Sequence, residues 1–121
     1  MLSERDRERY KRQLLMPGWG EAEQERCKNA RVLIAGAGGL GSPVSYYLAA
    51  AGVGTLVICD DGKLEFSNYN RQILYWETDL GVAKAEAAAE RVYEFNRDIE
   101  IVSSHTRIDD SSIGELAEGA D

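Results

Sequence analysis

Three short aliphatic runs separate the chain into alternating strand and helix patterns. The runs lack strict alternation of apolar and polar positions, which is typical of parallel strands covered on both faces. Strands are predicted at residues 31–35, 55–59 and 99–103, and helices at residues 42–51, 82–96 and 111–118. The order β-α-β-α-β-α, joined by right-handed crossovers, predicts an α/β fold with a Rossmann-like, doubly wound parallel sheet.

The chain before the first strand has a different, highly charged pattern. Residues 4–12 carry five basic and three acidic side chains, which by themselves indicate a solvated helix face. A Pro-Gly pair after them predicts a turn, and a short polar helix is expected over residues 21–29. We therefore divide the chain into an N-terminal helical segment, residues 1–30, and a Rossmann-like domain, residues 31–121.

Charge and composition argue against two classes of protein. The chain has 14 Lys and Arg against 21 Asp and Glu, a formal charge of -7, which disfavours binding to the phosphate backbone of a nucleic acid. Residues 32–59 contain no charged side chain and are long enough to span a bilayer, but six glycines and a proline divide them into strand, helix and strand. We therefore expect neither a nucleic-acid partner nor a membrane segment.

Outside the glycine-rich region, few side chains are of the types that bind metals or act as nucleophiles or bases. Cys27 and Cys59 have no recognisable metal-binding spacing, which indicates packing residues in a reducing, cytoplasmic setting. His105 is the one histidine, and we expect it to be solvated near the end of the third strand.

A glycine-rich loop follows the first strand and leads into a helix. Residues 36–41, Gly-Ala-Gly-Gly-Leu-Gly, fit the pattern G-x-G-x-x-G. Such glycines permit a tight turn and a close backbone approach, and the free amides and dipole of the helix favour a phosphate. Asp60 lies nineteen residues beyond Gly41, at the end of the second strand, where a carboxylate accepts hydrogen bonds from ribose hydroxyls. Its alternative role is to cap a turn.

Two cations help to choose between nucleotide chemistries. The glycine loop and Asp60 fit a nicotinamide or flavin cofactor as well as ATP. Arg71 lies in the loop after the second strand, and Lys84 lies at the start of the next helix. Transfer of a nucleotidyl group develops charge on phosphates that Arg and Lys stabilise, whereas hydride transfer needs no such cations. The alternative is that both are ordinary surface residues.

Six separated motifs occur in one order along the chain. They are Arg-Tyr-Lys-Arg-Gln at 9–13, Val-Leu-Ile-Ala-Gly-Ala-Gly-Gly-Leu-Gly-Ser at 32–42, Leu-Ala-Ala-Ala-Gly-Val-Gly at 48–54, Asp60, Ser67-Asn68 with Arg71-Gln72, and Gly81 with Lys84. Together they resemble the ThiF/MoeB/HesA-type members of the ubiquitin-activating-enzyme superfamily. The resemblance covers the chain from Arg9 to about Asn96.

The resemblance implies an activity. That family uses ATP and magnesium to adenylate the C-terminal glycine carboxylate of a small ubiquitin-like protein, and it forms an acyl adenylate and pyrophosphate. It therefore implies that the parent protein is an adenylyltransferase that activates a sulfur-carrier protein. Residues 31–121 would be part of its ATP-binding adenylation domain.

The same resemblance implies roles for individual residues. Arg71 and Lys84 would act on the phosphates as catalytic cations. In homodimeric members, the arginine that matches Arg12 reaches into the ATP site of the partner subunit, where it too would be catalytic. The implied ATP-binding residues are Gly36, Gly38, Gly39, Gly41, Asp60, Asn68, Arg71 and Lys84.

The chain also departs from the family pattern. Three strands form one half of the family's fold, and the first strand is expected to be an exposed sheet edge. The family's magnesium-binding aspartate follows a fourth strand, and its catalytic cysteine and Cys-x-x-Cys zinc ligands also match nothing in this sequence. We therefore expect no metal ligand in this chain, and a zinc site could belong only to the parent protein. We expect the chain in isolation to bind ATP weakly at best and to be catalytically inactive.

Two other functions remain open on the sequence. The first is an NAD(P)- or FAD-binding oxidoreductase domain, which shares the glycine loop and Asp60 but leaves Arg12, Arg71 and Lys84 unexplained. The second is a non-catalytic dimerisation module, in which a degenerate half-fold mediates association.

Overall fold

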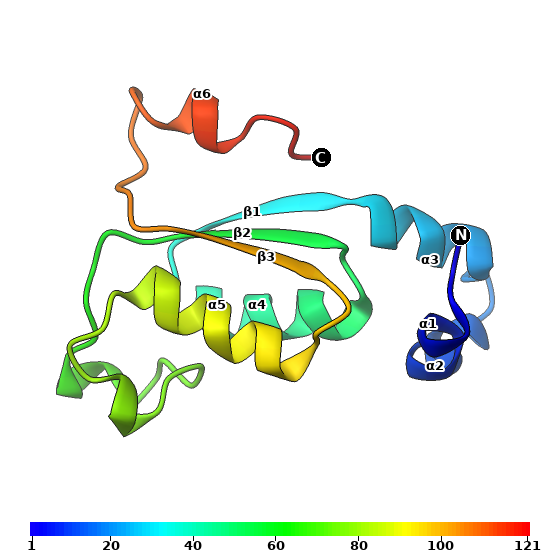
Figure 1. The fold of residues 1–121 in the computed structure, drawn as a ribbon, viewed down its shortest axis with the longest axis horizontal. Helices are drawn as coiled ribbons and strands as arrows, with labels where there is room; N and C mark the ends of the chain where they lie inside the picture. The colour runs from blue at the N-terminus through cyan, green and yellow to red at the C-terminus, as the bar shows by residue number, and fades with distance from the viewer.

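The computed structural model, which describes residues 1–121, contains one parallel sheet of three strands (Figure 1). The strands are β1 (Arg31–Ala35), β2 (Thr55–Cys59) and β3 (Glu100–Ser104), in the spatial order β1-β2-β3. Both neighbouring pairs are parallel. The predicted strands are confirmed, the third one residue later than expected, and β1 is an edge of the sheet.

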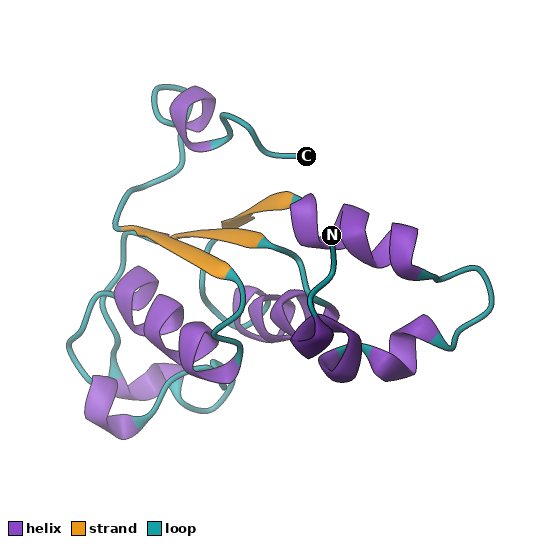
Figure 2. Cartoon of the chain, turned by 45° about the vertical axis from the view of Figure 1, so that its right-hand side comes forward, coloured by secondary structure: helices purple, strands orange, loops and turns teal.

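The helices cover the sheet as right-handed crossovers require. α4 (Gly41–Ala51) connects β1 to β2, and α5 (Lys84–Phe95) connects β2 to β3. Because both crossovers step in the same direction, both helices lie on one face, while α6 (Ile113–Leu116) lies on the other side of the sheet (Figures 1 and 2). The predicted α/β fold class is thus confirmed. None of the helices has both the length and the apolar character that a membrane span requires.

A few residues explain where helices α4 and α5 begin and end. Pro43 lies in the first turn of α4, where its missing N–H is tolerated, and Gly52 ends the helix with a left-handed φ of 90°. α5 begins two residues later than its sequence pattern, because residues 82–83 pair with Leu64 and Lys63 instead of joining the helix.

The C-terminal segment returns to the edge strand. Its helix is shorter than predicted, because a turn precedes it in which the Asp109 carboxylate accepts hydrogen bonds from the N–H groups of Ser111 and Ser112. Beyond α6, the Asp121 N–H donates to the Arg31 carbonyl and the Asp121 carboxylate accepts from the Arg31 N–H, both at 2.9 Å.

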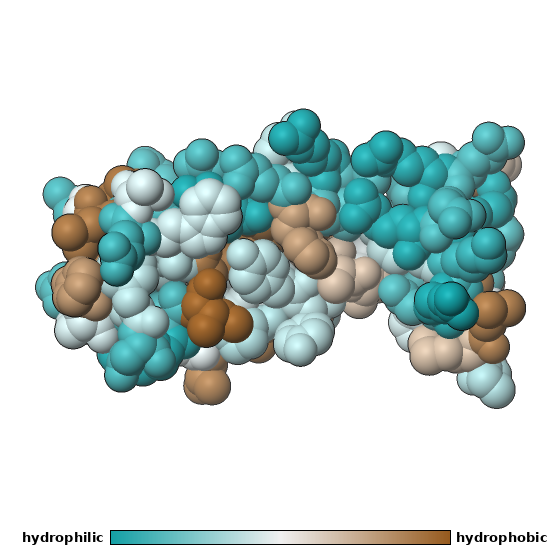
Figure 3. Space-filling view, turned by 90° about the horizontal axis from the view of Figure 1, so that it is seen from below, coloured by the Kyte–Doolittle hydropathy of each residue, from teal (hydrophilic) through white to brown (hydrophobic).

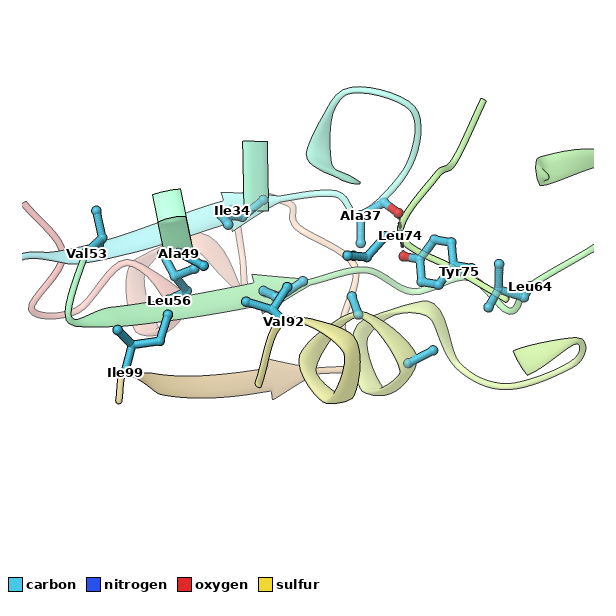
Figure 4. Packing of buried hydrophobic residues seen from close by; sticks show 13 residues of the cluster. Ile34, Ala37, Ala49, Val53, Leu56, Leu64, Leu74, Tyr75, Val92 and Ile99 are labelled. Carbon is cyan, nitrogen blue, oxygen red and sulfur yellow. Dashed lines mark hydrogen bonds between the residues drawn. The ribbon is translucent and has the colours of Figure 1, made fainter. Parts of the chain in front are cut away.

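The hydrophobic core lies between the sheet and helices α4 and α5. The central strand β2 contributes Leu56 and Ile58, which are fully buried. Leu74 and Tyr75, from the long segment after β2, complete the core beside Ala37 of the glycine loop (Figure 4). The cluster comprises Ile34, Ala37, Ala49, Val53, Leu56, Ile58, Leu64, Leu74, Tyr75, Ala87, Ala88, Val92 and Ile99.

Three short helices precede β1 and lie at the end of the sheet where the strands begin (Figure 1). They are α1 (Glu4–Arg9), α2 (Lys11–Leu14) and α3 (Glu21–Asn29), the last as predicted. The charged N-terminal pattern is divided at Tyr10, whose buried hydroxyl accepts a hydrogen bond from Asn96 at 3.1 Å. The charged pattern, which by itself describes one helix face, thus corresponds to two short helices that meet at the buried Tyr10.

The connection from β2 to α5 is long but ordered. It contains two 3₁₀ turns, η1 (Phe66–Asn68) and η2 (Glu77–Asp79), where the sequence predicts only a polar loop. An ion pair of 2.8 Å joins Asp79 to Arg91 of α5, and both side chains are buried. This connection carries several of the candidate site residues.

Candidate functional site

The fold itself requires only two of the four glycines in the glycine loop. Gly36 has a φ of 92°, and a Cβ on Gly41 would lie 2.0 Å from the Gly36 carbonyl oxygen. A Cβ on Gly38 would lie 3.7 Å from Gln72, and one on Gly39 would lie 3.6 Å from Arg71, which are ordinary contacts. Gly38 and Gly39 thus leave room that the protein does not fill, as a ligand that approaches the backbone would require.

The same loop holds a set of unused hydrogen-bond donors. The N–H groups of Gly38, Gly39, Leu40 and Gly41 donate to no acceptor in the chain, whereas the Ala37 N–H donates to Asp60. These free donors lie at the N-terminus of α4, which has 11 residues. Free amides combined with the positive end of a helix dipole favour an anion such as phosphate.

Asp60 lies beside this loop, after the end of β2. One carboxylate oxygen accepts from the Ala37 N–H at 3.0 Å, and the other accepts from the Gly62 N–H at 2.7 Å. Asp60 therefore caps the turn, which is the alternative role considered from the sequence. Each carboxylate oxygen retains a second lone pair that can accept from a ligand.

A pocket of about 260 Å³ opens at the carboxyl ends of the three strands, where open α/β sheets bind ligands. Its lining residues are Ala35, Gly36, Cys59, Asp60, Asp61, Thr106, Arg107 and Ile108. The part contributed after β3, including Arg107, was not predicted as a site from the sequence, because no motif marks it.

Arg71 and Asn68 approach the loop from the β2–α5 connection. The aliphatic part of Arg71 packs on Gly39, and its Nη1 donates to the Ser67 carbonyl at 3.2 Å and to Asn70 Oδ1 at 2.9 Å, without an acidic partner. Asn68 is buried, and its Oδ1 accepts from the Glu65 N–H at 2.9 Å. The amide nitrogen of Asn68 makes no hydrogen bond within the chain.

Gln72 is a site candidate that our sequence reasoning did not select. Its side chain is buried beside Gly38, and its Oε1 is the only buried side-chain oxygen or nitrogen without a hydrogen-bond partner. A buried polar atom left unpaired is costly, so this atom fits a place where a bound molecule or water supplies the missing bond. Its position directly after Arg71, in the motif of Ser67-Asn68 with Arg71-Gln72, was the available sequence signal.

Lys84 and Tyr75 complete this side of the site. The side chain of Lys84 runs alongside Gly62 and makes no ion pair. The Tyr75 hydroxyl donates to the Ala37 carbonyl at 2.5 Å and lies 3.4 Å from the Lys84 carbonyl (Figure 4). Burial raises the pKa of the Tyr75 phenol, and the charges of Asp60 and Asp79 raise it further. Tyr75 was not predicted as a site residue.

Arg12 lies away from the other candidate residues. It belongs to α2, and the neighbouring Gln13 donates to the carbonyl of Ala51 at the far end of α4. The 11 residues of α4 span about 16 Å. The structure therefore gathers the glycine loop, Asp60, Asn68, Arg71 and Lys84 at one end of α4 and leaves Arg12 at the other.

The ion pairs of the N-terminal segment distinguish Arg12 from its neighbours. Arg5 and Arg9 pair with Asp98, Arg7 pairs with Glu21, and Lys11 pairs with Glu8. Arg12 is exposed and makes no ion pair. Arg12 is therefore free to contact another molecule, although an exposed cation on a solvated face would look the same.

The remaining reactive side chains are not assembled into a centre. Cys59 is buried and Cys27 half-buried, both are free thiols, and burial raises the pKa of Cys27. His105 is exposed, as predicted. No three His, Cys, Asp or Glu side chains gather to hold a metal ion.

Comparison with known proteins identifies the family. The ThiF family model matches residues 10–121. The chain belongs to the ThiF family. This ThiF-family chain is 42% identical over 114 residues to the SAMP-activating enzyme E1 of Haloferax volcanii, across 94% of the chain and 42% of that protein. It is 49% identical over 107 residues to the adenylyltransferase and sulfurtransferase MOCS3 of Drosophila ananassae, across 88% of the chain and 24% of that protein.

A solved structure agrees with this assignment. The crystal structure of E. coli MccB with ATP superposes with a TM-score of 0.72 and 33% identity, across 76% of the chain and 28% of MccB. The chain thus spans less than half the length of each of these relatives.

Proposed function

We propose that this ThiF-family chain is the nucleotide-binding part of an ATP-dependent adenylyltransferase. The parent protein would activate the C-terminal glycine carboxylate of a small ubiquitin-like sulfur-carrier protein. The observation that carries the proposal is the row of four free N–H groups at Gly38, Gly39, Leu40 and Gly41, with the unpaired cation of Arg71 packed against it. Relatives named as an adenylyltransferase and as an activating enzyme support it.

The residues fit ATP in one orientation. The phosphates would lie on the free amides of the glycine loop, with Asn68, Arg71 and Lys84 along the triphosphate. The Asp60 carboxylate would accept from the ribose hydroxyls, and the pocket of about 260 Å³ would receive the nucleoside. The similarity to MccB, solved with ATP, supports ATP as the nucleotide.

Magnesium would neutralise phosphate charge when bound with the nucleotide. From the family resemblance, we propose that the protein ligand of magnesium lies elsewhere in the parent protein. Any zinc site would also belong to the parent protein. The 121-residue chain in isolation is then expected to be catalytically inactive.

The proposed reaction needs alignment and charge neutralisation more than a proton-transferring side chain. An oxygen of the glycine carboxylate attacks the α-phosphorus of ATP. The bond from that phosphorus to the oxygen bridging to the β-phosphorus breaks, and pyrophosphate leaves with the bonding electron pair. Arg71 and Lys84 would stabilise the charge that develops on the phosphates.

We also propose that the protein is a homodimer in which Arg12 acts in the partner's site. Leu40, at the N-cap of α4, forms one stripe with Val44 and Tyr47 of the helix, and the three are 85%, 45% and 76% exposed. Figure 3 shows hydrophobic side chains exposed on the face that carries α4 and α5. If two copies pack α4 antiparallel to α4, about a two-fold axis perpendicular to the helices, the Arg12 end of one helix meets the glycine-loop end of the other.

The division at residue 30 and the cytoplasmic setting belong to the same proposal. Residues 1–30 would supply the arginine finger, and residues 31–121 would bind the nucleotide. The two free thiols fit a reducing compartment.

Calorimetric titration tests the function directly. ATP, NAD and FAD are titrated into the full-length protein, with Lys84→Met as the variant and Lys63→Met, an exposed lysine without an ion pair, as the matched control. We expect ATP to bind, Lys84→Met to weaken it at least about tenfold, and Lys63→Met to leave it unchanged. Preferential NAD or FAD binding would favour the oxidoreductase, which the family match disfavours, and no nucleotide binding would favour the dimerisation module.

A further inference from the structure

Tyr75 lies where the glycine loop and the start of α5 meet. Its hydroxyl is 2.5 Å from the Ala37 carbonyl oxygen and 3.4 Å from that of Lys84. A hydroxyl has one proton, so the shorter contact is the main hydrogen bond. Only 5% of Tyr75 is exposed, which leaves little access for water to replace this bond.

This hydrogen bond determines the direction of a free amide. The Ala37 carbonyl and the Gly38 N–H belong to one peptide group, and the chain contains no cis peptide. In a trans peptide the carbonyl and the N–H point in opposite directions. The Tyr75 hydroxyl therefore holds the Gly38 N–H directed away from the core, where it has no acceptor within the chain.

The neighbouring contacts make this orientation rigid. On its other side, the Ala37 N–H donates to Asp60 at 3.0 Å. Tyr75 is itself held by the adjacent Leu74, which is fully buried in the core. The buried ion pair between Asp79 and Arg91 fastens the next part of the same connection to α5.

We propose that Tyr75 is a positioning residue of the glycine loop, whose hydroxyl orients the Ala37–Gly38 peptide so that the Gly38 N–H meets a phosphate group. The inference rests on the proposed nucleotide-binding function and adds a residue that touches neither phosphate nor ribose. Because burial and the charges of Asp60 and Asp79 raise the pKa of Tyr75, the hydroxyl keeps its proton at neutral pH and remains a donor.

Tyr75→Phe tests this role, because the ring is kept and only the hydroxyl is lost. Tyr69→Phe is the matched control, since the Tyr69 hydroxyl donates to the Trp76 carbonyl at 2.7 Å in the same connection. Inorganic pyrophosphate and ATP are titrated into the full-length protein by calorimetry. We expect Tyr75→Phe to weaken both about tenfold, and Tyr69→Phe to stay within about twofold of the wild type.

An NMR measurement distinguishes a change in the orientation of the Ala37–Gly38 peptide from a general loss of protein stability. In protein labelled with ¹⁵N-glycine and free of ligand, Tyr75→Phe is expected to move the amide resonance of Gly38 but not that of Gly52, at the far end of α4. Equal pyrophosphate affinity in Tyr75→Phe and the wild type, or an unmoved Gly38 resonance, would overturn the proposal. If the wild type binds neither pyrophosphate nor ATP, the proposed function fails, and this inference fails with it.

Discussion

The carboxylate of Asp79 and the guanidinium of Arg91 form a buried two-point ion pair, with Nη2 to Oδ1 at 2.8 Å and Nε to Oδ2 at 3.2 Å. The same carboxylate accepts the Trp76 N–H at 2.8 Å, and the guanidinium lies 4.0 Å from the centroid of the Trp76 ring. The long connection between β2 and α5 is therefore fastened to α5 close to the residues that face the glycine loop.

Asp79→Ala tests how much this ion pair stabilises the protein. The substitution leaves the buried Arg91 charge with only the half-exposed Glu94 as an acidic partner, so we expect the free energy of unfolding to fall by about 3 kcal/mol. Urea denaturation followed by circular dichroism measures the change. Glu94→Ala is the control, since Glu94 also contacts Arg91 but its side chain is 46% exposed, and it should cost less than about 1 kcal/mol. Equal losses in the two variants would contradict this account.

The backbone could be predicted from the sequence because the signals for strands and helices are local. The aliphatic runs gave β1 and β2 with their observed bounds, and Pro43 and Gly52 marked the two ends of α4. The prediction was less accurate where distant contacts decide the structure. The N-terminal charged pattern is divided at Tyr10, a buried residue whose hydroxyl accepts a hydrogen bond from Asn96, 86 residues away.

The same distinction applies to the candidate site. The glycine loop and Asp60 could be found because their spacing carries the signal. Tyr75 could not, because its contact with Ala37 spans 38 positions and depends on how the β2–α5 connection packs. Gln72 belongs to the same motif as Arg71, but its burial and its unpaired oxygen are visible only in the fold.

Substitutions at two glycines of the loop should distinguish an effect on folding from an effect on ligand binding. Gly41→Ala places a Cβ 2.0 Å from the Gly36 carbonyl oxygen, so it should cost about 1–3 kcal/mol of stability and also weaken ATP binding. Gly39→Ala meets only an ordinary contact with Arg71, so stability should change by less than about 0.5 kcal/mol. Its methyl group would nevertheless occupy the space proposed for a phosphate, and ATP binding should fall. Thermal denaturation and calorimetry measure the two effects, and normal ATP binding by Gly39→Ala would contradict the proposed placement.

Asp6 should make stability depend on pH in the acid range. Burial raises the pKa of the Asp6 carboxyl, but hydrogen bonds from Lys28 and Ser3 outweigh this and lower it to about 2. Because the folded-state pKa lies below the ordinary value of 3.8, the stabilisation is present above about pH 4 and is lost as the pH falls toward 2. We expect a loss of about 2 kcal/mol, measured by urea denaturation across this range. Asp6→Asn should flatten the dependence and Glu4→Gln should not. Parallel curves for Asp6→Asn and the wild type would refute the assignment.

The exposed stripe on α4 should control the oligomeric state. Tyr47→Glu introduces a charge into the proposed two-fold contact, where its burial would be unfavourable, so the protein should become monomeric. Sedimentation velocity measures the change. Tyr93→Glu, which alters a half-exposed tyrosine on α5, is the control and should remain dimeric. A wild type that sediments as a monomer, or a dimer unaffected by Tyr47→Glu, would exclude this contact.

Mixing two inactive variants should show in which subunit Arg12 acts. Arg12→Ala and Arg71→Ala are each expected to lower carrier-dependent exchange of pyrophosphate into ATP by the full-length protein at least about a hundredfold. In a mixed dimer, the site of the Arg12→Ala subunit keeps its own Arg71 and receives Arg12 from the Arg71→Ala subunit. One complete site per mixed dimer should therefore restore a substantial fraction of the activity. Lys11→Ala, which removes only the ion pair to Glu8, should remain active in isolation. If Arg12 acted within its own chain, both sites of the mixed dimer would stay incomplete, and mixing would restore nothing.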